Sequence, residues 1–119
     1  MPAKKKARGT SREEVARLVE LLEGEINNGG FHQFFYNSTG NETAEMIQAL
    51  KTIGATKTAD ILRRAAAKFP RGFPPKDRFK RQDLLDKVDP KIEVFEELDR
   101  EFYAYPDDLQ GLLEKYMDW

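Results

Sequence analysis

Apolar residues recur at intervals of three and four along most of the chain, which is the spacing of one face of an α-helix. The first such stripe comprises Val15, Leu18, Val19, Leu22 and Ile26. Thr10 or Ser11 can cap the start of this helix, and the sequence Asn-Asn-Gly-Gly at 27–30 can end it, because Asn and Gly tolerate left-handed backbone geometry. No segment shows sustained alternation of apolar and polar residues, so we predict an all-α fold.

The same spacing, together with the turn residues between stripes, predicts the remaining helices. They cover residues 31–36, 42–53, 56–68 and 77–87, with a turn at 37–41 and a proline-rich loop at 69–75. Asp89 and Pro90 suit the cap and the first position of another helix. Its predicted inner face holds Ile92, Phe95, Leu98, Phe102 and Tyr103. The sequence 106–108, Pro-Asp-Asp, starts the last helix, which brings the expected total to six or seven.

A chain of 119 residues supports one domain with one hydrophobic core. Residues 1–9 are polar and basic and predict a flexible tail, so the expected helical domain covers 10–119. No run of about 18 apolar residues is present, which predicts no membrane-spanning helix. The absence of cysteine excludes disulfides and thiolate metal sites and fits a reducing compartment, so we expect a cytoplasmic protein.

The net charge of −1 conceals an uneven distribution of charge along the sequence. Up to Arg81 there are 16 Lys and Arg against 9 Asp and Glu, whereas the remainder has 4 against 12. Such an asymmetry can attract partners of either sign, or the two halves can neutralise one another in the fold.

Residues 29–37, Gly-Gly-Phe-His-Gln-Phe-Phe-Tyr-Asn, combine a glycine hinge with four aromatic residues and the only histidine. Phe31, Phe34 and Phe35 have helical spacing, which favours a place in the core over a ligand pocket. We expect His32 to be half-buried, with one ring nitrogen bonded to a carbonyl or carboxylate. Tyr36, at the edge of this helix, is expected to offer polar groups to a second segment.

Asp99 is expected beside the apolar stripe of its helix, where a carboxylate needs hydrogen-bond donors. The backbone amides around Asn28 to Phe31, a range that includes Gly29 and Gly30, are candidate donors, so we hypothesise that Asp99 anchors the glycine hinge. A single histidine and no cysteine cannot build a typical zinc site, and the usual nucleophile and phosphate-binding signatures are missing. We therefore predict no catalytic site and no cofactor, while an enzyme or ligand binder built around His32, Tyr36 and Asp99 remains an alternative.

The charged residues allow two opposite functional interpretations. Basic residues in the tail and before 82 could contact nucleic-acid phosphates: Lys4, Lys5, Lys6 and Arg8, then Lys76, Arg78, Lys80 and Arg81. Carboxylates near the C-terminus could instead form an acidic face that imitates the phosphates of a duplex and binds a DNA-binding protein. The residues proposed for this face are Glu93, Glu96, Glu97, Glu101, Asp107, Asp108 and Glu114. Mimicry requires Glu93, Glu97, Glu101 and Asp108 to form one continuous face, and without such a face the hypothesis loses its basis.

The hinge segment and three further stretches resemble the signature of a bacterial family known for a DNA-mimic protein (the DMP type). The stretches are 25–37, then 47–55, 59–62 leading to Phe69-Pro70, and Leu98-Asp99 with Phe102-Tyr103. The resemblance covers about Glu13 to Tyr116. It implies an all-helical domain without a known catalytic site, in which an acidic surface substitutes for DNA, and it implies a homodimer by analogy with the best-known member.

This chain departs from the family pattern in its charge, because a DNA mimic should be strongly acidic. Transfer of the fold is therefore safer than transfer of mimicry. We expect a non-enzymatic protein-interaction domain whose partner is a DNA-binding protein, with direct nucleic-acid binding as the alternative.

Overall fold

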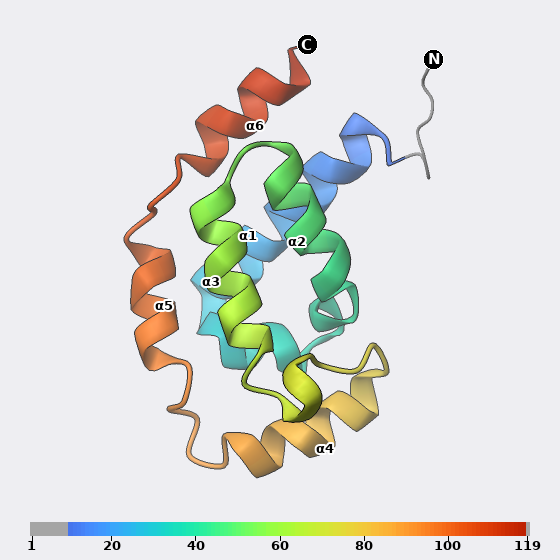
Figure 1. Ribbon diagram of the computed structural model, residues 1–119, viewed down its shortest axis with the longest axis vertical. Helices are drawn as coiled ribbons and strands as arrows, with labels where there is room; N and C mark the ends of the chain where they lie inside the picture. Colours follow the sequence, from blue (N-terminus) through green and yellow to red (C-terminus); the bar gives the residue numbers. More distant parts are fainter. Residues whose placement is uncertain (1–9, 119) are drawn as a thin grey trace.

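The computed structural model of the protein describes residues 10–118, and all the regular secondary structure in that part of the chain is helical (Figure 1). The all-α, single-domain prediction is therefore confirmed. The predicted basic tail, residues 1–9, lies outside the described residues. The elements in order are α1 (Arg12–Tyr36), the 3-10 helix η1 (Ser38–Glu42), α2 (Thr43–Thr52), α3 (Thr56–Ala66), the 3-10 helix η2 (Pro70–Gly72), α4 (Arg78–Val88), α5 (Glu96–Tyr103) and α6 (Leu109–Met117).

Helix α1 is longer than the sequence pattern predicts. It begins as expected, with the Ser11 side chain accepting a hydrogen bond from the Glu14 N–H at 3.0 Å. The expected stop at 27–30 is reduced to a kink, because only Gly30 leaves helical geometry and the chain resumes a helix at Phe31. Two predicted helices are thus joined end to end across one glycine.

The segment between α4 and α5 differs most from the prediction. Asp89 does not start a helix: it is the C-cap of α4 and is buried, and α5 begins only at Glu96. The Asp89 carboxylate accepts hydrogen bonds from the N–H groups of Glu93 and Val94, which folds this stretch into turns. Ile92, predicted to face inward, is 62% exposed as a result.

Tyr103 is the second residue of the predicted inner stripe that does not enter the core. It is 47% exposed, and its hydroxyl donates a hydrogen bond to the Ile26 carbonyl oxygen at 2.8 Å. Phe95, Leu98 and Phe102 are buried as predicted. The ring of Tyr103 therefore links α5 to α1 from the margin of the core.

The helices are arranged around α1, which packs against α2, α4, α5 and α6 (Figure 1). Helices α2 and α3 form an antiparallel pair over one side of α1, α4 crosses one end of the molecule, and α5 and α6 follow one long edge. The most completely buried side chains include Leu22, Ile26, Phe31, Phe34, Phe35, Met46, Leu50, Leu62 and Leu85. Among the described residues, no helix is both long enough and apolar enough to cross a membrane.

Candidate functional site

Gly30 creates a new helix start inside α1. Its φ of 76° and ψ of −174° lie in a region that is essentially restricted to glycine, and the break leaves the Phe31 N–H without an intrahelical acceptor. Asp99 of α5 accepts a hydrogen bond from this N–H at 2.8 Å. A Cβ at Gly30 would lie 2.7 Å from Asp99 Oδ2. The predicted contact between Asp99 and the glycine hinge is present, and the missing side chain of Gly30 makes room for it.

The electrostatic setting of Asp99 is unfavourable to its charge. Burial raises the pKa of this carboxyl above its ordinary value, and the hydrogen bond from the Phe31 N–H only partly opposes that effect. The negative charges of Asp89 and Glu96 raise the pKa further, while Arg100 lowers it. Asp99 therefore holds the hinge with a carboxylate that is costly to ionise.

The aromatic residues after the hinge form a closed cluster and not a pocket. Phe31, Phe34 and Phe35 are fully buried, as the helical spacing predicts. The Phe35 ring contacts the rings of Phe69 and Phe95, with centroids 4.9 Å and 5.5 Å away. Edge-to-face and tilted contacts of this kind add stability beyond the buried area. This cluster therefore joins α1 to the segment after α3 and to the start of α5.

His32 has the environment expected for a structural histidine. Its side chain is 20% exposed, its ring stacks on Tyr36, and its Nδ1 lies 2.7 Å from Asp89 Oδ2. Burial alone would raise the pKa of Asp89, but the hydrogen bonds from Val94 N–H, His32 and Glu93 N–H together lower it below its ordinary value. Asp89 is thus an ionised acceptor, so Nδ1 of His32 carries a hydrogen and donates a hydrogen bond to the carboxylate.

Arg81 was among the basic residues that could contact nucleic-acid phosphates, but it is completely buried. Its Nε donates to the Phe35 carbonyl, and Nη2 donates to the Asn37 carbonyl and to Asn41 Oδ1, over 2.7–2.9 Å. Nη1 donates to the carbonyls of Pro75 and Lys76. The guanidinium therefore uses all of its donors on acceptors at the C-terminal end of α1, where helix carbonyls lack partners, in η1 and in the segment before α4.

Two neighbours complete this contact between α4 and the end of α1. Gln82 donates from Nε2 to the backbone carbonyl of Tyr36 at 2.8 Å. Gly40 lies so close that a Cβ there would be 2.6 Å from Arg81 Nε. Asp89 and Arg81 are the two buried charged residues of the described chain, and the sequence analysis predicted neither burial. The only sequence signal for either was a charged residue at an inward position of its helix.

Several of the predicted acidic-face residues are used inside the fold. Glu101 forms an ion pair with Arg64 of α3, with 2.5 Å between Oε1 and Nη2. Asp107 accepts hydrogen bonds from the N–H and the hydroxyl of Thr58 at the start of α3. Asp108 caps α6 through the Gly111 N–H. The run of carboxylates is therefore interrupted by Arg64 at Glu101, and its Asp107 and Asp108 members stabilise helix starts.

The remaining residues of the predicted acidic face are exposed. Glu93, Glu96 and Glu97 make no side-chain ion pair with any residue in the described part of the chain. Glu114, on α6, is exposed and accepts a hydrogen bond from Gln110. Free carboxylates thus remain at both ends of the α5–α6 edge, and the group at the start of α5 is the denser one.

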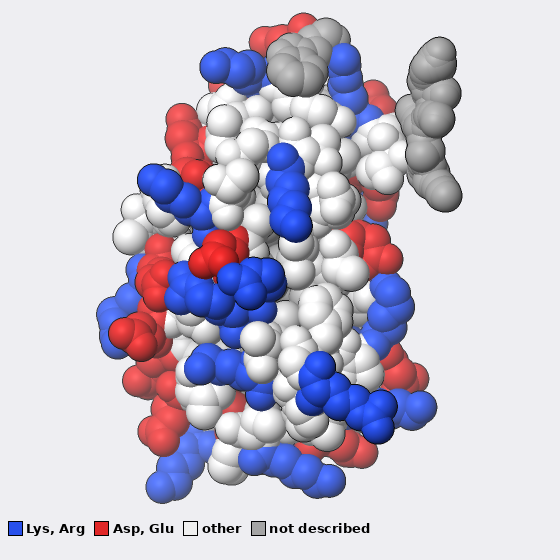
Figure 2. Space-filling model, viewed as in Figure 1, with Lys and Arg blue, Asp and Glu red and all other residues white. Residues whose placement is uncertain are grey.

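The face of the molecule shown in Figure 2 has mixed charge. On the face that includes α2 and α3, basic side chains stand among uncharged residues, and most acidic side chains gather at the borders with basic ones between them. In residues 10–118 no group of three or more His, Asp and Glu side chains is arranged to hold a metal ion.

Comparison with known proteins identifies a family. A family model described as DMP19-like protein matches residues 8–118, almost the whole chain. No curated protein and no solved structure matches the chain.

Proposed function

Since the chain belongs to the DMP19-like protein family, we propose that it is a non-enzymatic domain that binds a DNA-binding protein through the exposed carboxylates of its α5–α6 edge. The observation that carries this proposal is the group Glu93, Glu96 and Glu97, which stand exposed at and before the start of α5. The Lys and Arg side chains with which a DNA-binding protein neutralises phosphates can bind carboxylates instead of those phosphates. Electrostatic attraction also speeds the association of the two proteins.

The geometry narrows the acidic face that the sequence suggested. With Glu101 paired and Asp107 and Asp108 used as caps, Glu93, Glu96 and Glu97 form its centre, and Glu114 lies farther along the edge on α6. The molecule extends 46 Å along its longest axis, which is little more than one turn of a DNA duplex, and the free carboxylates occupy separated clusters along that length. We expect contact at one cluster, with an affinity that falls as salt increases.

The alternative functions have weaker support. The nucleic-acid interpretation loses Arg81, which is buried, and Lys76, which pairs with Glu45. The enzyme interpretation needs an accessible imidazole beside a second reactive group, whereas His32 is tied to Asp89 next to a closed aromatic cluster. These arrangements favour binding of a protein partner over nucleic-acid binding and over catalysis.

The proposal is tested by capture and then by competition. The immobilised protein is incubated with extract from its native cells, the bound proteins are identified by mass spectrometry, and the purified partner is titrated against its duplex DNA. We expect the protein to displace the DNA. The double change Glu96→Gln with Glu97→Gln should weaken displacement by about tenfold, because two charges at the centre of the contact are lost.

A matched control removes two carboxylates from another helix. Glu13→Gln with Glu20→Gln also removes one carboxylate from a first helical turn, on α1, and should leave displacement unchanged. Equal loss with both double variants would show an effect of net charge alone and would overturn the proposed site. A gel shift over a salt series, in which the protein itself retards duplex DNA, would overturn the proposed function.

A further inference from the structure

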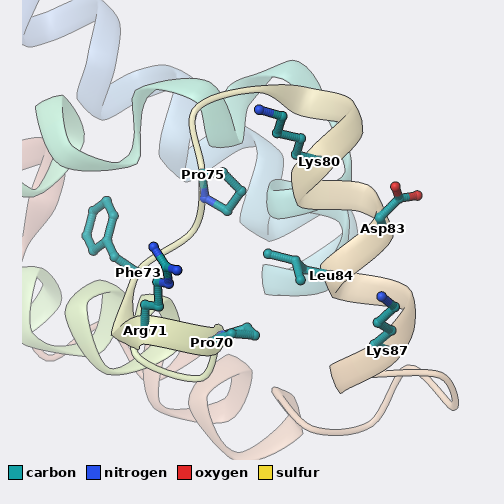
Figure 3. Close-up of a pocket in the computed structure, with 8 residues that line it drawn as sticks. All are labelled: Pro70, Arg71, Phe73, Pro75, Lys80, Asp83, Leu84 and Lys87. Atoms are coloured by element: carbon teal, nitrogen blue, oxygen red, sulfur yellow. The ribbon is translucent and has the colours of Figure 1, made fainter.

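An open pocket of about 570 Å³ lies between α4 and the loop that carries η2 (Figure 3). Its uncharged lining is formed by Pro70, Phe73, Pro75 and Leu84. In the close-up, Leu84 points from α4 toward the loop, and Pro70 faces it from the loop. Pockets of this volume accept one or two side chains of a peptide or a small ligand, and an apolar lining favours apolar groups.

The rest of the lining is mainly basic. Arg71 stands on the loop, and Lys80 and Lys87 lie along α4, against a single carboxylate, Asp83 (Figure 3). Asp83 points away from the loop in this view. None of the three cations forms an ion pair with a residue of the described chain, unlike Arg17, Arg63, Arg64 and Lys76. Their charge is therefore available to an anionic group that enters the pocket.

Arg71 has a strained backbone conformation. Its φ of 67° and ψ of 7° are left-handed, and the following Gly72 is also at positive φ. A left-handed backbone costs a non-glycine residue about 1 kcal/mol or more, whereas glycine adopts it freely. An arginine at this point therefore costs stability and adds a cation to the pocket, which is the combination found at many functional positions.

We infer that this pocket binds an acidic peptide segment of another protein, with an apolar side chain seated between Leu84 and the loop and flanking carboxylates on Arg71, Lys80 and Lys87. Such a segment matches both the apolar lining and the excess of positive charge. A nucleic-acid strand matches them less well, because three cations around one hollow can engage few phosphates, and strand binding depends on a basic track with stacking platforms. The site is distinct from the carboxylates of the α5–α6 edge and independent of the function proposed for them.

The test uses a fluorescein-labelled hexapeptide with two glutamates on each side of a leucine–phenylalanine pair, and measures anisotropy as the full-length protein is added. We expect saturable binding that weakens with salt. The triple change Arg71→Gly, Lys80→Gln and Lys87→Gln should weaken it by about tenfold or more, because the charge of the pocket is removed. The control triple Lys51→Gln, Lys57→Gln and Lys115→Gln removes the same charge elsewhere and should leave the affinity unchanged.

Arg71→Gly alone separates binding from folding. This change should weaken the peptide several-fold while the thermal midpoint stays the same or rises, because glycine relieves the strained backbone. A peptide with serines in place of leucine and phenylalanine should bind much more weakly, since the apolar contact is lost.

Four results would overturn the inference. Two concern the protein: the peptide shows no saturable binding up to about 1 mM, or the pocket triple and the control triple weaken binding equally. Two concern the ligand: the serine peptide binds with the same affinity as the leucine–phenylalanine peptide, or a single-stranded hexanucleotide binds more tightly than the peptide. The last result would reassign the pocket to nucleic acid. Peptide displacement by self-association of the protein, detected by sedimentation, would instead assign it to a second copy of the chain.

Discussion

Asp89 accepts hydrogen bonds from two backbone N–H groups between α4 and α5, and Asp99 accepts one at the kink inside α1, yet their surroundings shift their pKa values in opposite directions. Asp89 accepts from Glu93, Val94 and His32. Asp99 has the Phe31 N–H as its hydrogen-bond donor and lies near the negative charge of Asp89. Three donors outweigh desolvation at Asp89, and one does not at Asp99.

The difference shows that a similar contact can have two kinds of effect on the fold. As an ion, Asp89 stabilises the connection from α4 to α5. Asp99 fixes the geometry of the hinge, but much of the energy of its hydrogen bond offsets the cost of burying its charge. The same comparison explains why the hinge needs Gly30, since the carboxylate reaches the Phe31 N–H only where no Cβ intervenes.

The largest effect is expected from Asp89→Ala. Loss of a buried, multiply bonded carboxylate should lower the free energy of unfolding by about 3–5 kcal/mol, measured by urea titration with circular dichroism. The exposed Asp86, on the same helix, provides the control, and Asp86→Ala should cost less than about 0.5 kcal/mol. Equal stability of the two variants would contradict a structural role for Asp89.

Gly30→Ala should destabilise the protein by about 2–3 kcal/mol, because the new Cβ forces both a backbone conformation reserved for glycine and a displacement of Asp99. Gly24 lies in the same helix, is exposed and has open space where a Cβ would be. Gly24→Ala should therefore raise stability by about 0.5–1 kcal/mol. Opposite signs in thermal melts of the two variants are the expected outcome, and a neutral Gly30→Ala would rule out the tight hinge.

Asp99→Ala should cost about 1–2 kcal/mol, since the Phe31 N–H loses its acceptor while the penalty for a buried charge disappears. In the Asp99→Ala variant, amide hydrogen exchange at Phe31 should be faster than in the wild type. Exchange at Leu22, which lies within the uninterrupted part of α1, should change much less. Full retention of stability and of protection at Phe31 would disprove the anchoring hypothesis.

The smallest effect is a difference in pH dependence between Asp99→Asn and Asp89→Asn. The pKa of Asp99 is raised above 3.8 in the folded protein, so the folded state binds its proton more tightly and wild-type stability relative to Asp99→Asn falls as pH rises through that pKa. The pKa of Asp89 is lowered below 3.8, so its contribution is complete above 3.8 and is lost as pH falls through the lowered value.

These two trends are measured as differences in unfolding free energy between each variant and the wild type from pH 2.5 to 7. The cost of Asp99→Asn should shrink toward neutral pH, and the cost of Asp89→Asn should grow. Parallel curves for the two variants would show that the carboxylates share one electrostatic environment and would invalidate the contrast drawn between them.

Sequence periodicity predicted the helices well where local signals agreed. The caps at Ser11 and Asp108, the buried stripe of α1 and the aromatic cluster at 31–35 all follow from residue spacing and capping chemistry. The same rules failed at Asp89, because a residue that caps the start of a helix can equally accept N–H groups in a turn. They also failed at Arg81, whose acceptors come from segments about 40 residues earlier and just before α4.

The sequence by itself determined the helical class, the position of the hinge and the division into a basic and an acidic part, because these depend on neighbouring residues and on composition. Only the tertiary structure decided which charges remain free. It buried Arg81, paired Glu101 with Arg64 and left Glu93, Glu96 and Glu97 on one edge and Arg71, Lys80 and Lys87 around a pocket. The reason is physical: whether a charged side chain faces water, a carbonyl or an opposite charge depends on the packing of distant segments, which local spacing does not encode.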